Sequence, residues 1–220
     1  MGRIRRFYAS MVGKKVVMGV TGLIGVGFVI LHSLGNLLVF RGPEAINSYS
    51  HFLKSSGELL WALRIVLIVA VILHVVAAVQ LSRQSLAARP VGYVKREPQA
   101  ATIASRTMRW GGALLLIFIV LHILHFTTGT IRPTGYFSSE DVYANVVGSF
   151  RIWWVALFYI ISMIALGLHL FHGAWSSVRT IGVSPRSPHP LHRRISLVIA
   201  VFVWAAFTAI PVAVFAGWVR

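Results

Sequence analysis

One segment of the chain, residues 152–173, reads IWWVALFYIISMIALGLHLFHG and holds no Asp, Glu, Lys or Arg. As an α-helix it would be about 33 Å long at 1.5 Å per residue, enough to cross the hydrocarbon core of a bilayer. It also contains two histidines, His169 and His172. A titratable side chain inside a membrane-length helix is rare and normally faces a partner in the interior of a helix bundle. The segment therefore predicts a membrane-spanning helix with a buried polar site.

The rest of the chain repeats this hydrophobic pattern. Four further segments are long and apolar enough to span a membrane, at 16–40, 59–82, 110–128 and 195–218. Of the 220 residues, 57% are hydrophobic and 12% are charged, and the mean hydropathy is +0.77. A water-soluble domain of this size needs more charge on its surface. We predict an all-α integral membrane protein with five transmembrane helices, forming a single domain over residues 1–220.

The basic residues are distributed unevenly between the loops. The net charge is +16, and 15 of the 21 Lys and Arg residues lie in the N-terminal tail and the second and fourth loops, while four of the five acids lie in the other two loops. This is the positive-inside pattern, which places the N-terminus in the cytoplasm and the C-terminus outside. We therefore expect a multi-pass membrane protein with its basic loops in the cytoplasm. The basic face would attract anionic lipid or an acidic soluble partner, and nucleic acid is not the expected partner.

The chain contains no cysteine. Disulfides, thiolate-held iron–sulfur clusters and the C-x-x-C-H attachment of covalent haem are therefore excluded. Any iron–sulfur or flavin chemistry must come from a partner chain.

Histidines occur within four of the five predicted helices. They are His32, His74, the pair His122/His125 and the pair His169/His172. At 1.5 Å per residue, His32, His122 and His125 lie roughly 24, 18 and 22 Å from the cytoplasmic helix ends, and His74 and His169 lie roughly 12 and 6 Å from them. Helices one and three thus supply an outer layer, and helices two and four an inner layer. This arrangement suits two bis-histidine haems stacked across the membrane, so the first four helices are predicted to form a haem-binding bundle.

Small residues accompany these histidines at helical spacing. Thr21, Gly25 and Asn36 share the face of His32; Ala70 and Ala78 flank His74; Ser162, Ala165, Gly173 and Ser176 flank His169. They would leave room for a flat macrocycle, or they would simply let the helices pack closely. The small residues of the fourth predicted helix are centred better on His169 than on His172. On the third predicted helix, spacing alone leaves His122 and His125 as alternatives. The spare histidine of each pair would hydrogen-bond a propionate or quinone, or reach the interface.

Three arginines and three further histidines complete the candidate set. Arg64, Arg109 and Arg179 lie near helix ends, where they would either snorkel to the headgroups or pair with haem propionates. His51, His189 and His192 are expected to be solvated loop residues.

Four sequence stretches resemble a known family. They are HSLGN at 32–36 with RGPEAINSYSHF at 41–52, ILH at 72–74, RWGG at 109–112 leading to His122, and HLFHGAWS at 169–176. In order and spacing the chain is similar to the single-chain, five-helix, di-haem cytochrome b anchor subunit of succinate:quinone oxidoreductases, which include succinate dehydrogenases and fumarate reductases. The resemblance covers nearly the whole chain.

The resemblance implies specific residue roles. His32 and His122 would ligate the iron of the outer haem, and His74 and His169 that of the inner haem, the last standing four residues before Gly173. It also implies a place in the bacterial inner (cytoplasmic) membrane, with a flavoprotein and an iron–sulfur subunit docked on the cytoplasmic face. Electrons would pass through two b haems to a membrane quinone, with menaquinone expected, and the chain would not be catalytic alone.

Two other functions fit parts of the sequence. One is the haem b, quinone-linked anchor of another dehydrogenase or of a hydrogenase. The other is a haem-free transporter whose histidines relay protons or bind substrate, although broken helices and inverted repeats, which are common in transporters, are not evident in the sequence.

Overall fold

The computed structural model describes residues 2–88, 102–182 and 190–220. Within these ranges, five helices are long and apolar enough to cross a membrane. They are α2 (Met11–Asn36) with its 3-10 extension η1 (Leu37–Arg41), α4 (Glu58–Ala87), α5 (Ile103–His122) with the π-helical turn η2 (Ile123–Thr127), α7 (Trp153–Thr180) and α8 (Pro190–Phe215). The predicted all-α, five-helix membrane fold is confirmed.

The helices are longer than predicted at the end of the bundle that holds the N-terminus, which we call the inner end. The first begins at Met11, the second runs to Ala87 and the third begins at Ile103. Capping explains two of these positions, because the Ser10 hydroxyl accepts from the Gly13 amide at 2.9 Å and the Thr102 hydroxyl accepts from the Ser105 amide at 3.2 Å. Such caps satisfy amides that would otherwise lack a partner at a helix start. The apolar pattern marks only the hydrocarbon-spanning part of each helix.

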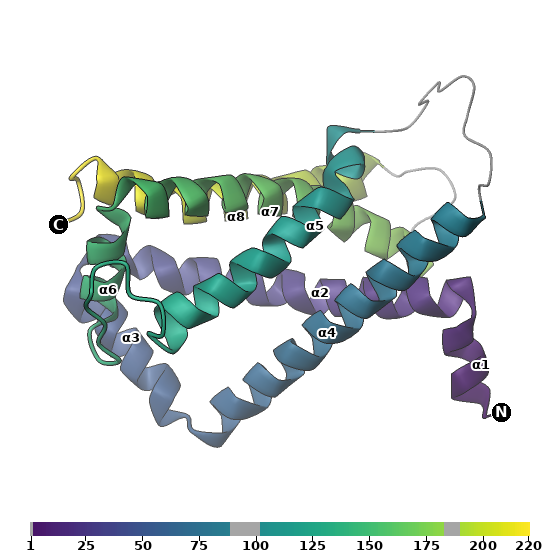
Figure 1. The fold of residues 1–220 in the computed structure, drawn as a ribbon, viewed down its shortest axis with the longest axis horizontal. Helices are drawn as coiled ribbons and strands as arrows, with labels where there is room; N and C mark the ends of the chain where they lie inside the picture. The colour runs from purple at the N-terminus through teal and green to yellow at the C-terminus, as the bar shows by residue number, and fades with distance from the viewer. Residues whose placement is uncertain (1, 89–101, 183–189) are drawn as a thin grey trace.

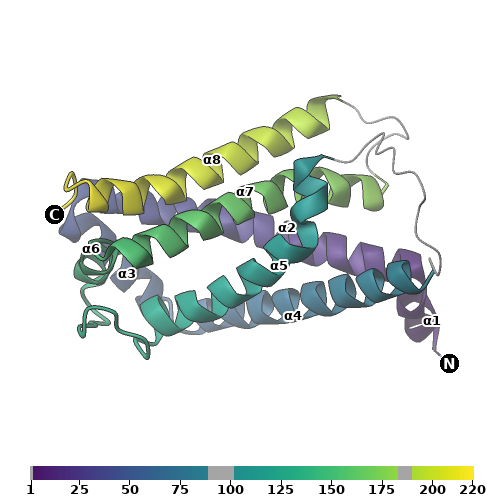
Figure 2. The same cartoon turned by 45° about the horizontal axis from the view of Figure 1, so that its top comes forward.

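The long helices pack around α7. It contacts α8, α5 and α2, while α4 packs against α2. In Figure 1, α2, α7 and α8 run nearly along the long axis and α4 and α5 cross it obliquely. Figure 2 shows α5 between α7 and α4 from a second side. The two termini lie at opposite ends of the bundle (Figure 1), as an odd number of spans requires.

The outer end of the bundle is covered by two short helices. One of them is α6 (Val142–Phe150) in the third loop. A second one, α3 (Pro43–Ser55), occupies the first outer loop and was not predicted, although Pro43 stands at its first turn, where proline is favoured. Side chains join α3 to the α6 region, since Asn47 Nδ2 donates to Asp141 Oδ1 at 3.0 Å and the Glu140 carboxylate pairs with His51 at 3.2 Å.

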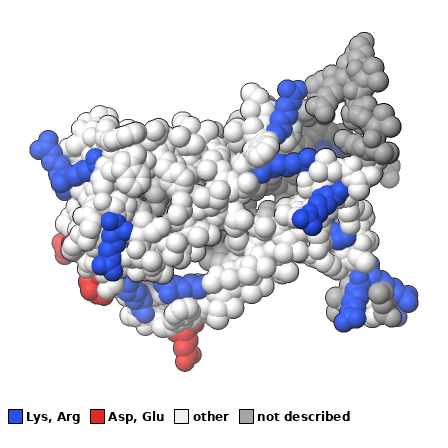
Figure 3. Space-filling view, in the orientation of Figure 1, with Lys and Arg blue, Asp and Glu red and all other residues white. Residues whose placement is uncertain are grey.

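The surface of the bundle is largely apolar between its charged ends. Exposed aliphatic side chains line the length of α4, among them Leu63, Ile65, Ile68 and Ile72. Figure 3 shows the acidic residues of this face at the left and lower left, at the outer end of the bundle, and a group of Lys and Arg at the inner end, on the right. An apolar belt between polar ends is typical of a protein surrounded by lipid. Arg89, Lys95, Arg96 and Arg186, which contribute to the predicted basic face, lie outside the described residues.

Candidate functional site

We call His32 and His122 the outer pair. His32 comes from α2 and His122 from the last turn of α5, and their ring centres lie 5.9 Å apart with the planes at 83°. Phenylalanine rings hold both imidazoles: Phe28 stacks on His32 at 5.2 Å, and Phe118 stacks on His122 at 5.5 Å. Asn36 Nδ2 lies 3.3 Å from His32 Nδ1, one turn along α2.

We call His74 and His169 the inner pair. His74 comes from α4 and His169 from α7, and their ring centres lie 6.1 Å apart with the planes at 57°. His74 Nδ1 lies 3.0 Å from the carbonyl oxygen of Met18 on α2. A carbonyl oxygen only accepts, so Nδ1 carries the proton and donates, and Nε2 keeps its free lone pair. This is the usual arrangement of a histidine that binds metal through its other nitrogen.

The spacing within both pairs fits a metal held between two imidazoles. Two metal–nitrogen bonds of about 2 Å, with about 1 Å more from each nitrogen to its ring centre, put two axial imidazoles about 6 Å apart. The structure shows 5.9 Å in the outer pair and 6.1 Å in the inner pair. Among the described residues, no group of three or more His, Asp or Glu gathers in a metal-binding arrangement. Two imidazoles are too few for a bare ion, so a macrocycle that supplies the remaining ligands fits this donor set.

The second histidine of each predicted doublet points elsewhere. His125 lies in η2. There the Thr128 amide donates to the carbonyl oxygen of Ile123, five residues earlier, whereas an α-helix bonds residues four apart. The wider π turn carries His125 toward α6 and α7, where its Nδ1 lies 3.1 Å from the Tyr159 hydroxyl and its Nε2 lies 2.9 Å from Ser149 Oγ. His172 contacts the edge of Trp175, with ring centres 5.8 Å apart.

Small residues surround the inner pair. A Cβ added at Gly22 would lie 3.2 Å from His74 Cε1, and one at Gly112 would lie 3.9 Å from His169 Cε1. Glycine therefore lets α2 and α5 approach the imidazoles closely. Thr21, eleven residues before His32 on α2, lies near the inner pair, with its hydroxyl 3.4 Å from His74 Nδ1.

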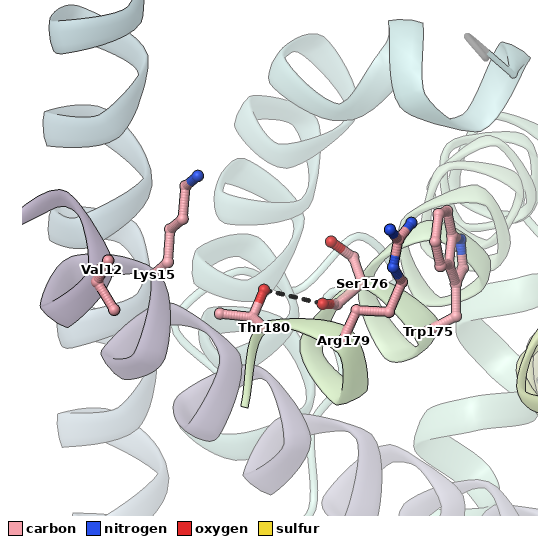
Figure 4. A pocket seen from close by; sticks show the side chains of 6 residues that line it. All are labelled: Val12, Lys15, Trp175, Ser176, Arg179 and Thr180. Atoms are coloured by element: carbon pink, nitrogen blue, oxygen red, sulfur yellow. Dashed lines mark hydrogen bonds between the residues drawn. The ribbon is translucent and has the colours of Figure 1, made fainter. Parts of the chain in front are cut away.

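A basic pocket lies at the inner end of α2 and α7, about two helical turns beyond His169. We define it by the residues that line it, Val12, Lys15, Trp175, Ser176, Arg179 and Thr180, around a volume of about 360 Å³. Figure 4 shows Lys15 entering from α2 and the other cation, Arg179, entering from α7. The Arg179 guanidinium lies 5.2 Å from the centre of the Trp175 ring. Sequence reasoning found Arg179 but missed Lys15, whose place next to α7 depends on helix packing.

The remaining candidates lie outside these groups. Arg64 places its guanidinium 5.1 Å from the Trp61 ring centre on the same helix, and Arg109 is exposed on α5. His51 is exposed as expected, but it belongs to helix α3 rather than to a loop and pairs with Glu140. His192 belongs to α8, and His189 lies outside the described residues.

The fold and the two imidazole pairs are those expected of a class of protein, the membrane cytochromes b. No protein-family model matches the chain, and no solved structure matches it. Over 191 residues, 85% of this chain and 87% of the relative, it is 30% identical to the succinate dehydrogenase cytochrome b558 subunit of Bacillus subtilis (strain 168).

The chain belongs to the family of succinate dehydrogenase cytochrome b subunits. It is a multi-pass protein of the bacterial cytoplasmic membrane and a membrane anchor of that enzyme class. The resemblance stated from the sequence is thereby confirmed at the level of the family.

Proposed function

We propose that this chain binds two b haems, one between His32 and His122 and one between His74 and His169. The observation that carries the proposal is the ring spacing of about 6 Å in both pairs, which would suit two imidazoles that hold one iron between them. The two pairs draw on four different helices at two depths, which agrees with the layers expected from the helix rise. His74 also has the backbone partner that a metal-ligating histidine needs.

We further propose that the basic pocket receives the propionates of the inner haem. Ser176 is seven residues beyond His169, so the pocket lies about 10 Å further along α7. Lys15 and Arg179 bring two cations to one pocket, and arginine suits planar, bidentate recognition of a carboxylate. In this role Lys15 joins Arg179, while Arg109 has less support because it does not line the pocket.

A haem held by two imidazoles takes up and releases single electrons, and two of them at different depths would carry electrons through the bilayer. The chain would therefore transfer electrons from an iron–sulfur subunit to a quinone, with menaquinone expected. The iron–sulfur and flavoprotein subunits would dock on the basic inner end, where the tail and α7 present Arg3, Arg5, Arg6 and Arg179. The chain would supply binding, orientation and potential tuning, and the partner chains would catalyse succinate oxidation.

Two alternatives are separated from this proposal by particular observations. The anchor of another haem b, quinone-linked dehydrogenase or hydrogenase would have the same imidazole pairs, but the relative is a succinate dehydrogenase subunit. A haem-free transporter has no need for two imidazole pairs at a metal-binding spacing. The long helices α4 and α7 are also unbroken, whereas transporters often use discontinuous helices around a midplane site.

The test measures haem in the complex purified from its own membrane. Reduced-minus-oxidised spectra should show haem b, and haem extraction should give two haems per chain. Replacing His122 with Ala should leave one haem, because the outer iron loses an axial ligand. The matched control is His125→Ala, three residues away, which should keep two.

The opposite result, one haem in His125→Ala and two in His122→Ala, would assign the outer ligand to His125. Absence of any haem b band in the wild-type complex would reject the proposal and favour the transporter.

A further inference from the structure

A chain of polar side chains runs from α6 to the outer pair. Ser149 on α6 contacts His125 in η2, with 2.9 Å between Oγ and Nε2. His125 contacts Tyr159 on α7, with 3.1 Å between Nδ1 and the hydroxyl. The same hydroxyl lies 3.5 Å from Nδ1 of His122. We call these four residues the outer hydrogen-bond chain.

The outer hydrogen-bond chain is buried among aromatic rings. The exposed fractions of Ser149, His125 and Tyr159 are 3%, 7% and 7%. Phe126 stacks on His125 with ring centres 4.0 Å apart, and Phe150 packs against Tyr159 at 5.0 Å. Buried polar groups in such a setting are costly unless they bond one another. The contacts within the outer hydrogen-bond chain therefore hold η2, α6 and α7 in one relative position.

The π turn is a second, independent feature of the same place. A π turn interrupts regular helical bonding, and such turns occur often at functional sites. Here η2 begins at Ile123, directly after His122. The turn takes His125 away from the outer pair and places it against Tyr159 and Ser149. The irregular backbone thus completes the outer hydrogen-bond chain.

The direction of the hydrogen bonds follows from chemistry once His122 binds iron through Nε2. Its proton must then be on Nδ1, which donates to the Tyr159 oxygen. The Tyr159 hydroxyl in turn donates to Nδ1 of His125, whose Nε2–H donates to Ser149. In the reverse direction Tyr159 would donate to Nδ1 of His122, which would leave the proton on Nε2 and no lone pair for a metal.

We propose that Tyr159, held by His125 and Ser149, is a positioning residue that fixes the tautomer and ring plane of His122 and tunes the outer haem. The inference rests on the proposed function. A partner that accepts the Nδ1 proton makes the imidazole a stronger donor to its metal and stabilises the ferric state. Tyr159 therefore lowers the midpoint potential of the outer haem and leaves that of the inner haem unchanged.

The experiment is a redox titration of both haems in the purified complex, together with low-spin EPR spectra, which respond to the angle between the axial imidazole planes. Tyr159→Phe removes the hydroxyl and keeps the ring. We expect two bound haems, a higher midpoint potential for the outer haem and a shifted EPR signal of the outer haem. The matched control is Tyr143→Phe on α6, where the lost hydroxyl donates to the Arg220 carbonyl instead, and it should change neither haem.

A second pair of variants isolates His125. In His125→Leu the Tyr159 hydroxyl loses its acceptor, so the outer potential should move. In His125→Gln a side chain of similar length keeps an acceptor and a donor, so the potential should stay near the wild-type value. If Tyr159→Phe loses the outer haem, this second pair decides the question by the same readouts.

Unchanged outer potential and EPR signal in Tyr159→Phe, with both haems bound, would overturn the inference, as would equal behaviour of His125→Leu and His125→Gln. A wild-type complex without haem b would instead overturn the proposed function, and the inference with it.

Discussion

The outer and inner pairs have nearly equal ring spacings, 5.9 and 6.1 Å, in different surroundings. Aromatic rings and the outer hydrogen-bond chain enclose the outer pair, and the short helices α3 and α6 cover that end of the bundle. In the described part of the chain no Phe or Tyr ring stacks on the inner pair. Glycines pack against it instead, and the basic pocket lies about two helical turns beyond His169.

This difference shows two physical ways of holding an imidazole inside a membrane protein. The outer pair depends on side-chain hydrogen bonds between helices, which set ring orientation and respond to single-atom changes. The inner pair depends on close backbone approach, with a carbonyl of α2 as the partner of His74. Substitutions that add volume should therefore damage the inner site most, and substitutions that remove one polar atom should affect the outer site most.

The largest effect is expected from added volume at Gly22. A Cβ there would already lie 3.2 Å from His74 Cε1, so the side chain of Gly22→Leu must displace the imidazole. We predict a complex with one haem, the outer one, measured by haem extraction and redox titration. Leucine favours helix more than glycine does, so weakening of α2 would not explain the loss.

Gly27→Leu is the matched control for that substitution. It lies on an exposed part of α2, and nothing lies within 4 Å of a Cβ added there. It should keep both haems. Retention of both haems with unchanged potentials in Gly22→Leu would show that close approach of α2 is not what holds His74.

A second prediction concerns charge in the basic pocket. A unit charge about 10 Å from a redox centre contributes about 1 to 2 kcal/mol at an effective dielectric constant of about 20. Arg179 is exposed, so water screens part of this. Arg179→Gln should therefore lower the midpoint potential of the inner haem by an amount on the order of tens of millivolts, since a cation stabilises the reduced state. Redox titration measures it.

The control is Arg106→Gln, which removes an exposed cation of α5 at the same end. If Arg106→Gln shifted the midpoint potential of the inner haem as much as Arg179→Gln does, the overall charge of the inner end, and not the basic pocket, would set that potential.

The sequence predicted much of this arrangement because helix rise and hydropathy both report position along the membrane normal. They placed five spans, and they put His32 in an outer layer with the His122/His125 doublet and His74 in an inner layer with His169. The choice of His122 over His125 came from the family resemblance, and the structure brings the ring centre of His122 to 5.9 Å from that of His32. The depth of a residue along the membrane normal says little about how its helix is rotated about its own axis. Lys15 and Tyr159 were missed because their roles depend on which helix each one faces after packing.

Two backbone features also escaped prediction. The π turn η2 has no clear signal in the apolar run around His122, since it differs from an α-helix by one residue in the hydrogen bonding. Helix α3 was missed because its segment is short and polar on one face, and tertiary contacts with the α6 region hold it in place. Pro43 was the one local signal of its start.

The smallest effect is expected in the outer covering helices, which support the outer pair from a distance. Asp141 Oδ1 accepts from the Ala144 amide at 3.0 Å as the cap of α6, and it also accepts from Asn47 Nδ2 at 3.0 Å. Asp141→Ala should cost about 1 to 2 kcal/mol of stability. Because α6 carries Ser149, heating should release the outer haem of the variant at a lower temperature than in the wild type, with the inner haem unaffected. Absorbance of each haem during a thermal ramp measures this.

The matched control is the neighbouring variant Glu140→Ala. It removes exposed ion pairs with His51 and Lys54, which contribute about 0.5 kcal/mol or less, and an exposed hydrogen bond from the Ser139 hydroxyl. If both variants lowered the release temperatures of the two haems equally, the covering helices would stabilise the whole bundle, and the outer pair would have no separate support.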